Sequence, residues 1–370
     1  MKKLLLQLHL CLGLAASLFL IVLSLTGAVM VFENELNRAV NPHLLTASPG
    51  GRPLPWEQVR RDVERQEPAW RVQRMYMPAT DSDSTYVRLA SRSTGVTREI
   101  YVNQYTGAIL GRKELGNQLI WKIHELHINL AEGYAGSQVV AAASVALLFL
   151  SLSGLYLWWP RRIFRFRMSP QAGHTNYDLH RVLGFWSSLA MFLFAVTGIN
   201  LHIQTGGTLF NMMDAKASAV NLPGHGATAD EMIAAASEAV PGARPMRISF
   251  WGGKRPVLVQ LRFPEDHTPA GRTNVTLDPR TGRVLTVESS RTAPVVFTAL
   301  IEWNREIHTG TIFGMPSRIA AAVFSLLLAA LAITGPLIWL NRRAALARGR
   351  RMAAERRAAG VLKPAGQTQE

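Results

Sequence analysis

The sequence predicts an α-helical membrane protein with four transmembrane helices, arranged as two tandem two-span repeats, and with two outer α+β modules. Three observations support this: four long, nearly charge-free segments, an internal repeat and an uneven distribution of basic residues. The segments are residues 4–32, 137–159, 182–203 and 319–340. At about 1.5 Å of rise per residue, each can cross a hydrocarbon core of about 30 Å.

The internal repeat appears when residues 127–162 are shifted by 181 positions onto residues 308–343. His127, Gly133, Ser144, Leu147, Leu150, Gly154, Trp158, Arg161 and Arg162 then match His308, Gly314, Ser325, Leu328, Leu331, Gly335, Trp339, Arg342 and Arg343. At an offset of 171, Leu8, His9, Leu12, Gly13, Ser17, Leu18, Thr26 and Gly27 match Leu179, His180, Leu183, Gly184, Ser188, Leu189, Thr197 and Gly198. The pattern predicts two copies of one two-span unit.

The net charge of +15 is concentrated on one side of the predicted membrane. Residues 33–136 hold 13 Lys or Arg against 12 Asp or Glu, and residues 204–317 hold 11 against 10. The N-terminus, the 160–181 linker and the segment after residue 340 together hold 15 against 3. This positive-inside pattern predicts cytoplasmic termini and a basic tail near anionic lipid, and no nucleic-acid partner.

The first apolar segment resembles a secretory signal but continues to Glu33 without a convincing cleavage site, so we expect it to be retained as a span. The predicted order is span 1 (1–36), outer module 1 (37–120), a juxtamembrane segment with span 2 (121–162), a cytoplasmic loop (163–179), span 3 (180–204), outer module 2 (205–300), a juxtamembrane segment with span 4 (301–343) and a basic cytoplasmic tail (344–370).

Each outer module is predicted to begin with a helix, at 56–67 or 229–239, which is followed by strands. The first set of strands is 72–77, 85–90, 98–102 and 108–110, and the second is 246–250, 257–263, 273–277 and 283–285. Neither module carries an evident nucleophile-and-base arrangement or a phosphate-binding glycine loop.

Four histidines occupy matching positions in the two repeats and are the candidate iron ligands. His9 and His180 lie near the cytoplasmic ends of spans 1 and 3, and His127 and His308 precede spans 2 and 4. Parallel repeats are related by an axis along the membrane normal, so matching histidines face each other across it. Two opposed imidazoles are the ligand set of a six-coordinate haem, which predicts one haem near each membrane face.

Gly13 and Gly184 follow their histidines by four residues, on the same helix face, where a missing side chain would admit a flat ring or allow close helix packing. His202 and His124 are reserve ligands for the outer haem. His43, His174, His225 and His267 lie in polar loops and are expected to be solvated. Cys11 is the only cysteine and no Cys-x-x-Cys-His motif is present, so both haems would be non-covalent, of the b type.

The ordered membrane motifs resemble the PepSY-associated transmembrane family over nearly the whole chain. The residues that carry the resemblance are Leu8, His9, Gly13, His127, the run 153–161, the run 178–184, and the segment 300–314 with His308. The outer modules, with turns at Thr106-Gly107 and Thr281-Gly282, resemble PepSY domains.

The resemblance implies a bacterial inner-membrane protein, similar to dihaem reductases of ferric siderophores, with both modules in the periplasm. Electrons would pass from a cytoplasmic or membrane donor to the ferric siderophore, releasing Fe(II) for uptake. No Gly-x-Gly-x-x-Gly fingerprint is present, so the donor is expected to be external, a quinol or a reduced flavin. Arg244, Arg247, Lys254, Arg255 and Arg262 would attract an anionic chelate or form a solvated face.

Two other functions compete with this reading. The chain could be a non-catalytic membrane module whose outer domains bind a peptidase or a sensor, or a permease for the siderophore itself. Haem content separates the reductase from both alternatives. Four spans without an obvious pair of broken helices argue against a permease.

Overall fold

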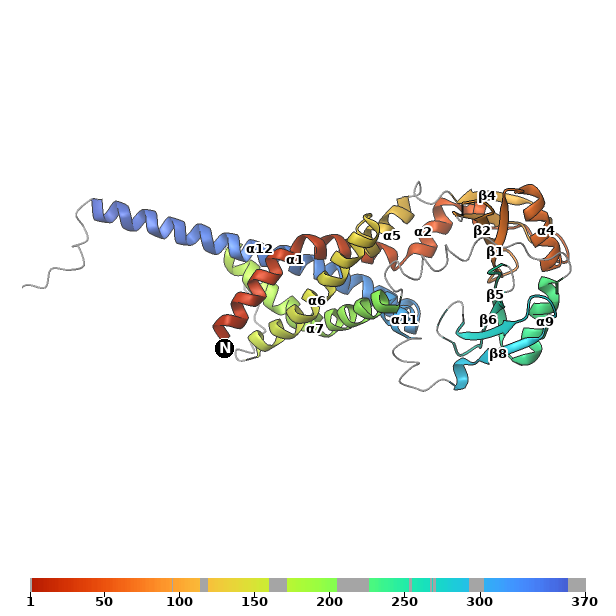
Figure 1. The fold of residues 1–370 in the computed structure, drawn as a ribbon. Coiled ribbons are helices and arrows are strands. Elements are labelled where there is room, and N and C mark those ends of the chain that lie inside the picture. Colours follow the sequence, from red (N-terminus) through yellow and green to blue (C-terminus); the bar gives the residue numbers. More distant parts are fainter. Residues whose placement is uncertain are drawn as a thin grey trace, which may run out of the picture. The chain divides into compact units, whose positions relative to one another are not determined.

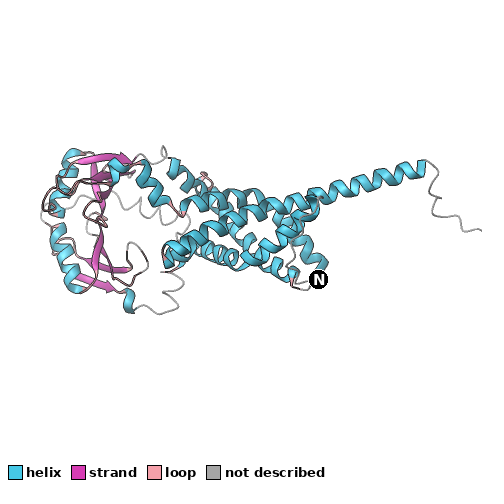
Figure 2. Ribbon diagram, turned by 180° about the vertical axis from the view of Figure 1, so that it is seen from behind, coloured by secondary structure: helices cyan, strands magenta, loops and turns pink. Residues whose placement is uncertain are grey.

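A computed structural model describes residues 2–94, 96–113, 119–159, 172–204, 226–252, 255–266, 268, 271–292 and 303–358. The chain divides into two compact units. Figure 1 colours the chain by residue number and Figure 2 by secondary structure. The helical unit comprises Met1–Gly27, Ala142–Val196 and Val323–Glu370. The sheet unit comprises Ala28–Ala141 and Thr197–Ala322.

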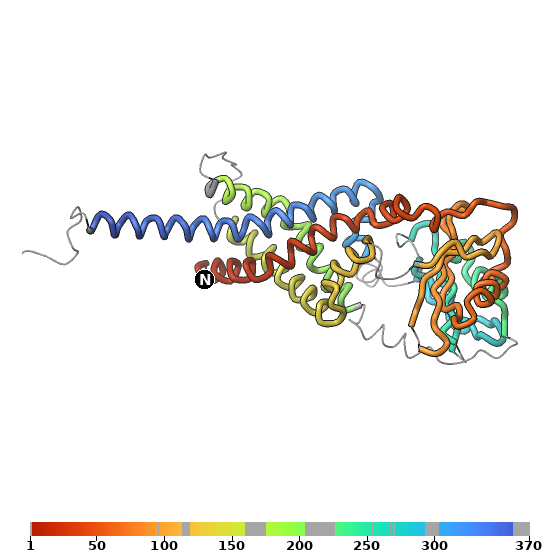
Figure 3. Tube along the Cα trace, turned by 90° about the horizontal axis from the view of Figure 1, so that it is seen from above, coloured from red at the N-terminus to blue at the C-terminus, as the bar shows by residue number. Residues whose placement is uncertain are grey.

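Among the described residues, four helices are long and apolar enough to cross a membrane. They are α1 (Lys2–Met30), α6 (Gly133–Trp158), α7 (Ala172–Gln204) and α12 (Met315–Ala358), traced as tubes in Figure 3. Within the helical unit they share one core, built from Ala16, Leu20, Ala143, Leu147, Met191, Ala195, Leu328, Leu331 and Ala332. The small residues in this core allow the helix backbones to approach closely.

The outward faces of these helices are also apolar. Leu18, Trp186 and Leu189 are each about two-thirds exposed, at 66%, 66% and 69% of their accessible surface. Exposing such large side chains to water is unfavourable, whereas lipid tails solvate them. The four helices therefore identify a multi-pass membrane protein.

Two helix boundaries differ from the prediction. Helix α7 begins at Ala172 and not near residue 182, so His174, which was assigned to a polar loop, lies in a helix. Helix α12 continues past residue 340 to Ala358, so the described part of the basic tail is helical. Hydropathy marks where a helix becomes polar, but Arg and Ala support helix as well as Leu does, so the backbone need not stop there.

The described residues of the sheet unit form eight strands. They are β1 (Trp70–Tyr76), β2 (Thr85–Ser91), β3 (Thr97–Val102), β4 (Ile109–Lys113), β5 (Arg244–Ser249), β6 (Val257–Arg262), β7 (Thr273–Leu277) and β8 (Val284–Glu288). Its helices are α2 (Glu33–Val40), α3 (Pro42–Leu45), α4 (Trp56–Gln66), α5 (Leu119–Asn129), α9 (Ala229–Ala239) and α11 (Asn304–Thr309), with 3-10 turns η1 (Ser290–Thr292) and η3 (Thr311–Phe313).

The strands of the two predicted modules form one antiparallel sheet, in the order β4-β3-β2-β1-β5-β6-β7-β8. The seam between the halves is the pairing of β1 with β5, centred on Met75 opposite Ile248. Without this pairing, β1 and β5 would each present an unpaired edge. The prediction of two α+β modules holds for their elements, and the structure adds that they share a continuous sheet.

One face of this sheet is apolar and is covered by α4 and α9, which Figure 1 shows on the same side. Its central row is fully buried and consists of Ile100, Val87, Met75, Ile248, Val259 and Val275. Val59 and Val63 of α4, with Met232 and Ala236 of α9, complete the same core. Alternation along each strand places these residues on one face and their polar neighbours on the other.

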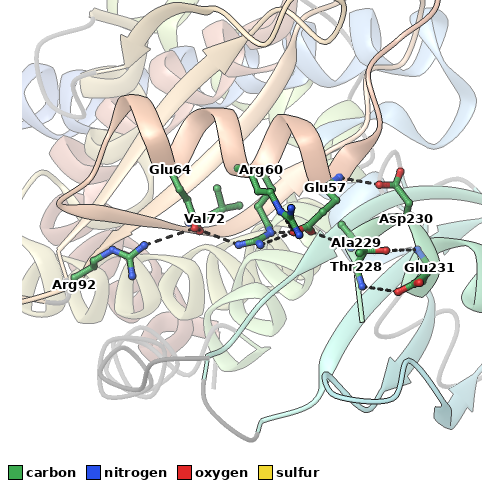
Figure 4. A network of polar contacts seen from close by, with 10 residues as sticks. Glu57, Arg60, Glu64, Val72, Arg92, Thr228, Ala229, Asp230 and Glu231 are labelled. Carbon is green, nitrogen blue, oxygen red and sulfur yellow. Dashed lines mark hydrogen bonds and ion pairs between the residues drawn. The ribbon is translucent and has the colours of Figure 1, made fainter. Parts of the chain in front are cut away.

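The N-termini of α4 and α9 are capped by each other's carboxylates (Figure 4). Asp230 of α9 accepts hydrogen bonds from the backbone amides of Trp56 and Glu57, both at 2.9 Å. Glu57 of α4 accepts one in return from the backbone amide of Ala229, at 3.2 Å. Carboxylates satisfy the free amides and the positive end of a helix dipole, so this exchange couples the two halves.

Replacing Asp230 with alanine is expected to destabilise the sheet unit by about 1–2 kcal/mol, because two amides at the start of α4 lose a charged acceptor. The measurement is unfolding of the full-length protein in detergent, followed by tryptophan fluorescence. Glu238→Ala is the matched control, since Glu238 is an exposed carboxylate on the same helix. Equal stability of the two variants would show that the exchanged cap contributes nothing.

The same contact predicts a pH dependence through Glu57. Burial opposes its ionisation, but hydrogen bonds and charge from Arg60, with further bonds from Arg61 and Ala229, lower the pKa of the carboxyl below 4.5. A lowered folded-state pKa contributes stability above the unfolded value and loses it as pH falls through the folded value. The stability difference between wild type and Glu57→Gln should therefore shrink from about pH 6 to about pH 3.

Candidate functional site

The first candidate site lies in the helical unit and contains His9 and His180. Nδ1 of His9 lies 2.8 Å from the Ser153 hydroxyl of α6, and Nδ1 of His180 lies 2.8 Å from the Thr334 hydroxyl of α12. Both hydroxyl groups belong to buried residues. Both rings of the predicted inner pair therefore lie in the helical unit, each beside a hydroxyl group of another helix.

Two glycines lie directly against these imidazoles. A Cβ atom added to Gly154 would lie 3.3 Å from Cε1 of His9, and one added to Gly335 would lie 3.6 Å from Cε1 of His180. A Cβ on Gly13 or Gly184 would instead meet a leucine, at 3.8 or 3.9 Å. The close approach to the rings is thus made by Gly154 and Gly335, and a haem-facing role for Gly13 and Gly184 stays a prediction.

The second candidate site lies in the sheet unit and contains His127 and His308. Each lies in the last turn of a short helix that precedes a candidate span, α5 before α6 and α11 before α12. Gly133 and Gly314 follow in these connections with φ of 55° and 70°. Glycine adopts this left-handed conformation without steric cost, which explains why both repeats have it there.

The two imidazoles of the second site lie close together. Their ring centres are 6.3 Å apart and their planes are inclined by 56°. A metal–imidazole bond of about 2 Å on each side of one ion, plus about 1 Å from each nitrogen to its ring centre, gives roughly 6 Å. The spacing therefore fits two axial ligands of one iron.

A threonine orients His308 in the same manner as the hydroxyls of the first site. The Thr197 hydroxyl lies 2.9 Å from Nδ1 of His308, and the carbonyl of Thr197 accepts a hydrogen bond from the Asn304 side chain. Glu306, two residues before His308, is 1% exposed, and neither carboxylate oxygen has a hydrogen-bond partner among the described residues.

The other histidines have different surroundings. His124 is stacked on Trp121 with ring centres 5.2 Å apart, and its Nδ1 lies 3.2 Å from the Glu33 carboxylate. Nε2 of His202 lies 3.4 Å from the side-chain nitrogen of Gln138. His43 is exposed, as expected, but it lies in the helix α3 and not in a loop. The side chain of His174, and all of His225 and His267, lie outside the described residues.

Each of the two histidine pairs could hold one haem. In the parts of the chain that the structure describes, no cluster of three or more His, Cys, Asp or Glu side chains is placed to hold a metal. Histidines in pairs, with hydroxyls at Nδ1 of His9, His180 and His308, suit a cofactor that supplies its remaining ligands itself.

Sequence reasoning missed the roles of Ser153, Thr334 and Thr197. All three are hydroxyl residues that directly precede glycines matched between the repeats. The predicted arginine cluster forms only in part. Arg244 and Arg262 donate to backbone carbonyls of Pro78, Ala79 and Asp266, whereas Lys254 lies outside the described residues.

A family model described as the PepSY-associated TM region matches residues 6–342. No curated protein matches the chain significantly. The family match spans all four candidate membrane helices up to residue 342, the eight-stranded sheet and both histidine pairs. By this match the chain belongs to the PepSY-associated transmembrane family.

Proposed function

We propose that this protein is a dihaem oxidoreductase of the bacterial inner membrane that transfers electrons to a ferric siderophore in the periplasm. The observation that carries the proposal is the 6.3 Å separation of the His127 and His308 ring centres. This spacing suits two imidazoles on opposite sides of one iron.

His9 and His180 would hold the inner haem, and His127 and His308 the outer haem, both of them non-covalent b-type groups. Bound haem supplies a reversible one-electron couple, which is the chemistry that reduction of Fe(III) to Fe(II) requires. Ser153 and Thr334 hold the inner rings at Nδ1, and Thr197 holds His308. The hydroxyls of Ser153 and Thr334 also donate to the backbone carbonyls of Leu150 and Leu331, so each can accept a hydrogen bond from Nδ1–H. In that tautomer Nε2 carries no proton and could ligate iron.

The proposed tandem repeat is supported by equivalent contacts in the helical unit. His9 and His180 are 171 residues apart, and their partners Ser153 and Thr334 are 181 apart, which are the two offsets of the sequence match. The distance from Nδ1 to the hydroxyl oxygen is 2.8 Å both between His9 and Ser153 and between His180 and Thr334. A symmetric arrangement of the two repeats explains why the same histidine–hydroxyl contact occurs twice, with each partner shifted by its own offset.

The orientation follows from charge. The segments rich in Lys and Arg are those expected in the cytoplasm, so both termini would lie there and the eight-stranded sheet in the periplasm. A quinol in the membrane or a reduced flavin in the cytoplasm would be the donor. Siderophores bind Fe(II) much less tightly than Fe(III), so reduction in the periplasm would release the iron for uptake.

The purified protein is expected to show low-spin haem, about two per chain, that acidic organic solvent extracts because no thioether bond holds it. Reduced protein in proteoliposomes should then be reoxidised by an external ferric siderophore, with the Fe(II) product captured by a chelator. Absorbance of the haem and of the Fe(II) chelate would be followed together.

Two results would change this proposal. A protein without haem would favour a non-catalytic module that binds a peptidase or a sensor, or a siderophore permease. Haem that stays reduced with a range of ferric siderophores, but passes electrons to another periplasmic acceptor, would keep the oxidoreductase and remove the siderophore as its substrate.

A further inference from the structure

The face of the sheet opposite α4 and α9 carries a strip of aromatic and basic side chains. Neighbours across the strands run from Arg247 on β5 through Tyr76 on β1 and Tyr86 on β2 to Tyr101 on β3. The ring centres of Tyr76 and Tyr86 are 4.9 Å apart, and those of Tyr86 and Tyr101 are 5.6 Å apart. The guanidinium of Arg247 lies 5.5 Å from the centre of the Tyr76 ring.

A second row on the same face brings like charges together. Arg74 on β1 lies directly opposite Arg88 on β2. Like charges at directly opposite positions destabilise a sheet. Glu99, the next residue across, forms an ion pair with Arg88 at 2.9 Å, and Arg74 lies 5.0 Å from the centre of the Trp251 ring. One carboxylate of this row therefore accompanies two guanidinium groups.

These groups gather at the seam of the sheet. Arg74 and Arg247 flank the central pair of the seam, Met75 and Ile248, on opposite sides. Each half of the sheet contributes one of these two arginines, so neither half alone could build this surface. We call Arg74, Arg88, Arg247, Tyr76, Tyr86 and Tyr101 the arginine–tyrosine face.

Part of the donor capacity of this face is unused. The Nε atoms of Arg88 and Arg247 are buried and have no hydrogen-bond partner among the described residues. A buried donor without an acceptor is costly. The tyrosines do not supply the missing negative charge: burial, and after it the charge of Glu99, raises the pKa of Tyr101 to about 12. The face thus offers positive charge and hydrogen-bond donors beside a row of neutral rings.

We propose that the arginine–tyrosine face binds a small anionic chelate whose charge is carried by aromatic oxygen donors, such as a catecholate complex. Guanidinium groups form strong, directional hydrogen bonds with oxyanions. Tyr76 and Tyr86 are partly exposed and provide ring surface for the aromatic part of the ligand, whereas Tyr101 is buried beside them. Identifying this ligand as the electron acceptor rests on the proposed function, whereas its binding requires no haem.

The test is equilibrium dialysis of the full-length protein in detergent against a ferric tris-catecholate complex, which is a trianion. Wild type should bind the trianion more tightly than a neutral ferric trihydroxamate, and added salt should weaken binding. Arg74→Gln and Arg247→Gln should each reduce affinity about tenfold, the effect of losing one hydrogen bond to a charged group. Arg283→Gln, an equal charge change at an exposed loop position, should leave affinity nearly unchanged.

Equal binding of the trianion and the neutral complex by wild type would overturn the proposal without any variant. So would unchanged affinity in both arginine variants. The test is independent of electron transfer. If the protein never incorporates haem but binds the trianion, the result supports this binding face and contradicts the reductase. If haem-loaded protein reduces chelates but does not bind the trianion, the result supports the reductase and contradicts this binding face.

Discussion

Replacing His308 with alanine is expected to remove the outer haem and keep the inner one, which lowers the content from about two haems per chain to about one. The ring centres of His308 and its partner His127 are 6.3 Å apart. With only one of the two imidazoles, the iron would lack one of its two protein ligands. His127→Ala should have the same effect, while His9→Ala or His180→Ala should remove the inner haem. Extracted haem per chain and the absorption spectrum are the measurements.

His43→Ala provides the control, because it deletes an exposed imidazole outside both pairs. His124→Ala and His202→Ala test the reserve ligands. His124 already contacts Glu33 and Trp121, so its loss should leave both haems in place. If either reserve variant loses the outer haem while His127→Ala retains it, the assigned ligand pair is wrong.

The local elements of this fold could be read from the sequence because their patterns are local. Apolar and polar residues alternate along 257–262, which predicts a strand. The structure has the strand β6 there, with Val257, Val259 and Leu261 buried. Helix α9 starts and ends where the pattern predicts, since Thr228 and Glu231 form a capping box. Such signals depend on neighbours in the chain, which a single sequence contains.

The joining of the two halves could not be predicted in this way. Strand β1 has the same alternation whether its free edge meets β5, another strand or water. The choice is made by Met75 opposite Ile248 and by the exchanged caps of Asp230 and Glu57, contacts between residues more than 170 positions apart. Only Arg247 of the arginine–tyrosine face could be singled out from the sequence, because the other members lie on the opposite side of this seam.

The histidine pairs could be predicted in part. The internal repeat showed that His9 and His180, and likewise His127 and His308, are equivalent, and symmetry then implied that they meet. The repeat did not show which helix supplies the partner of each ring. Ser153 and Thr334 are seen to orient the rings only once α6 and α12 are placed beside α1 and α7.

Replacing Gly154 with leucine is expected to remove the inner haem, because the new side chain would occupy the space of the His9 ring. A Cβ at this position already lies 3.3 Å from Cε1 of His9, so the ring must shift slightly even for alanine. Alanine should therefore retain the haem with an altered spectrum, and leucine should lower the content by about one haem per chain. Gly335→Leu should act on His180 in the same way, from 3.6 Å.

Gly349→Leu is the matched control, since Gly349 lies in the same helix as Gly335 and has no atom within 4 Å of an added Cβ. It should leave both haems bound. Circular dichroism reports whether the helices stay folded in the leucine variants. The outer haem should remain bound in them, because its ligands His127 and His308 belong to the other unit. Loss of one haem with an unchanged helical signal would separate displacement of His9 from unfolding of the helices. Retention of both haems by Gly154→Leu and Gly335→Leu would mean that His9 and His180 are not the inner ligands.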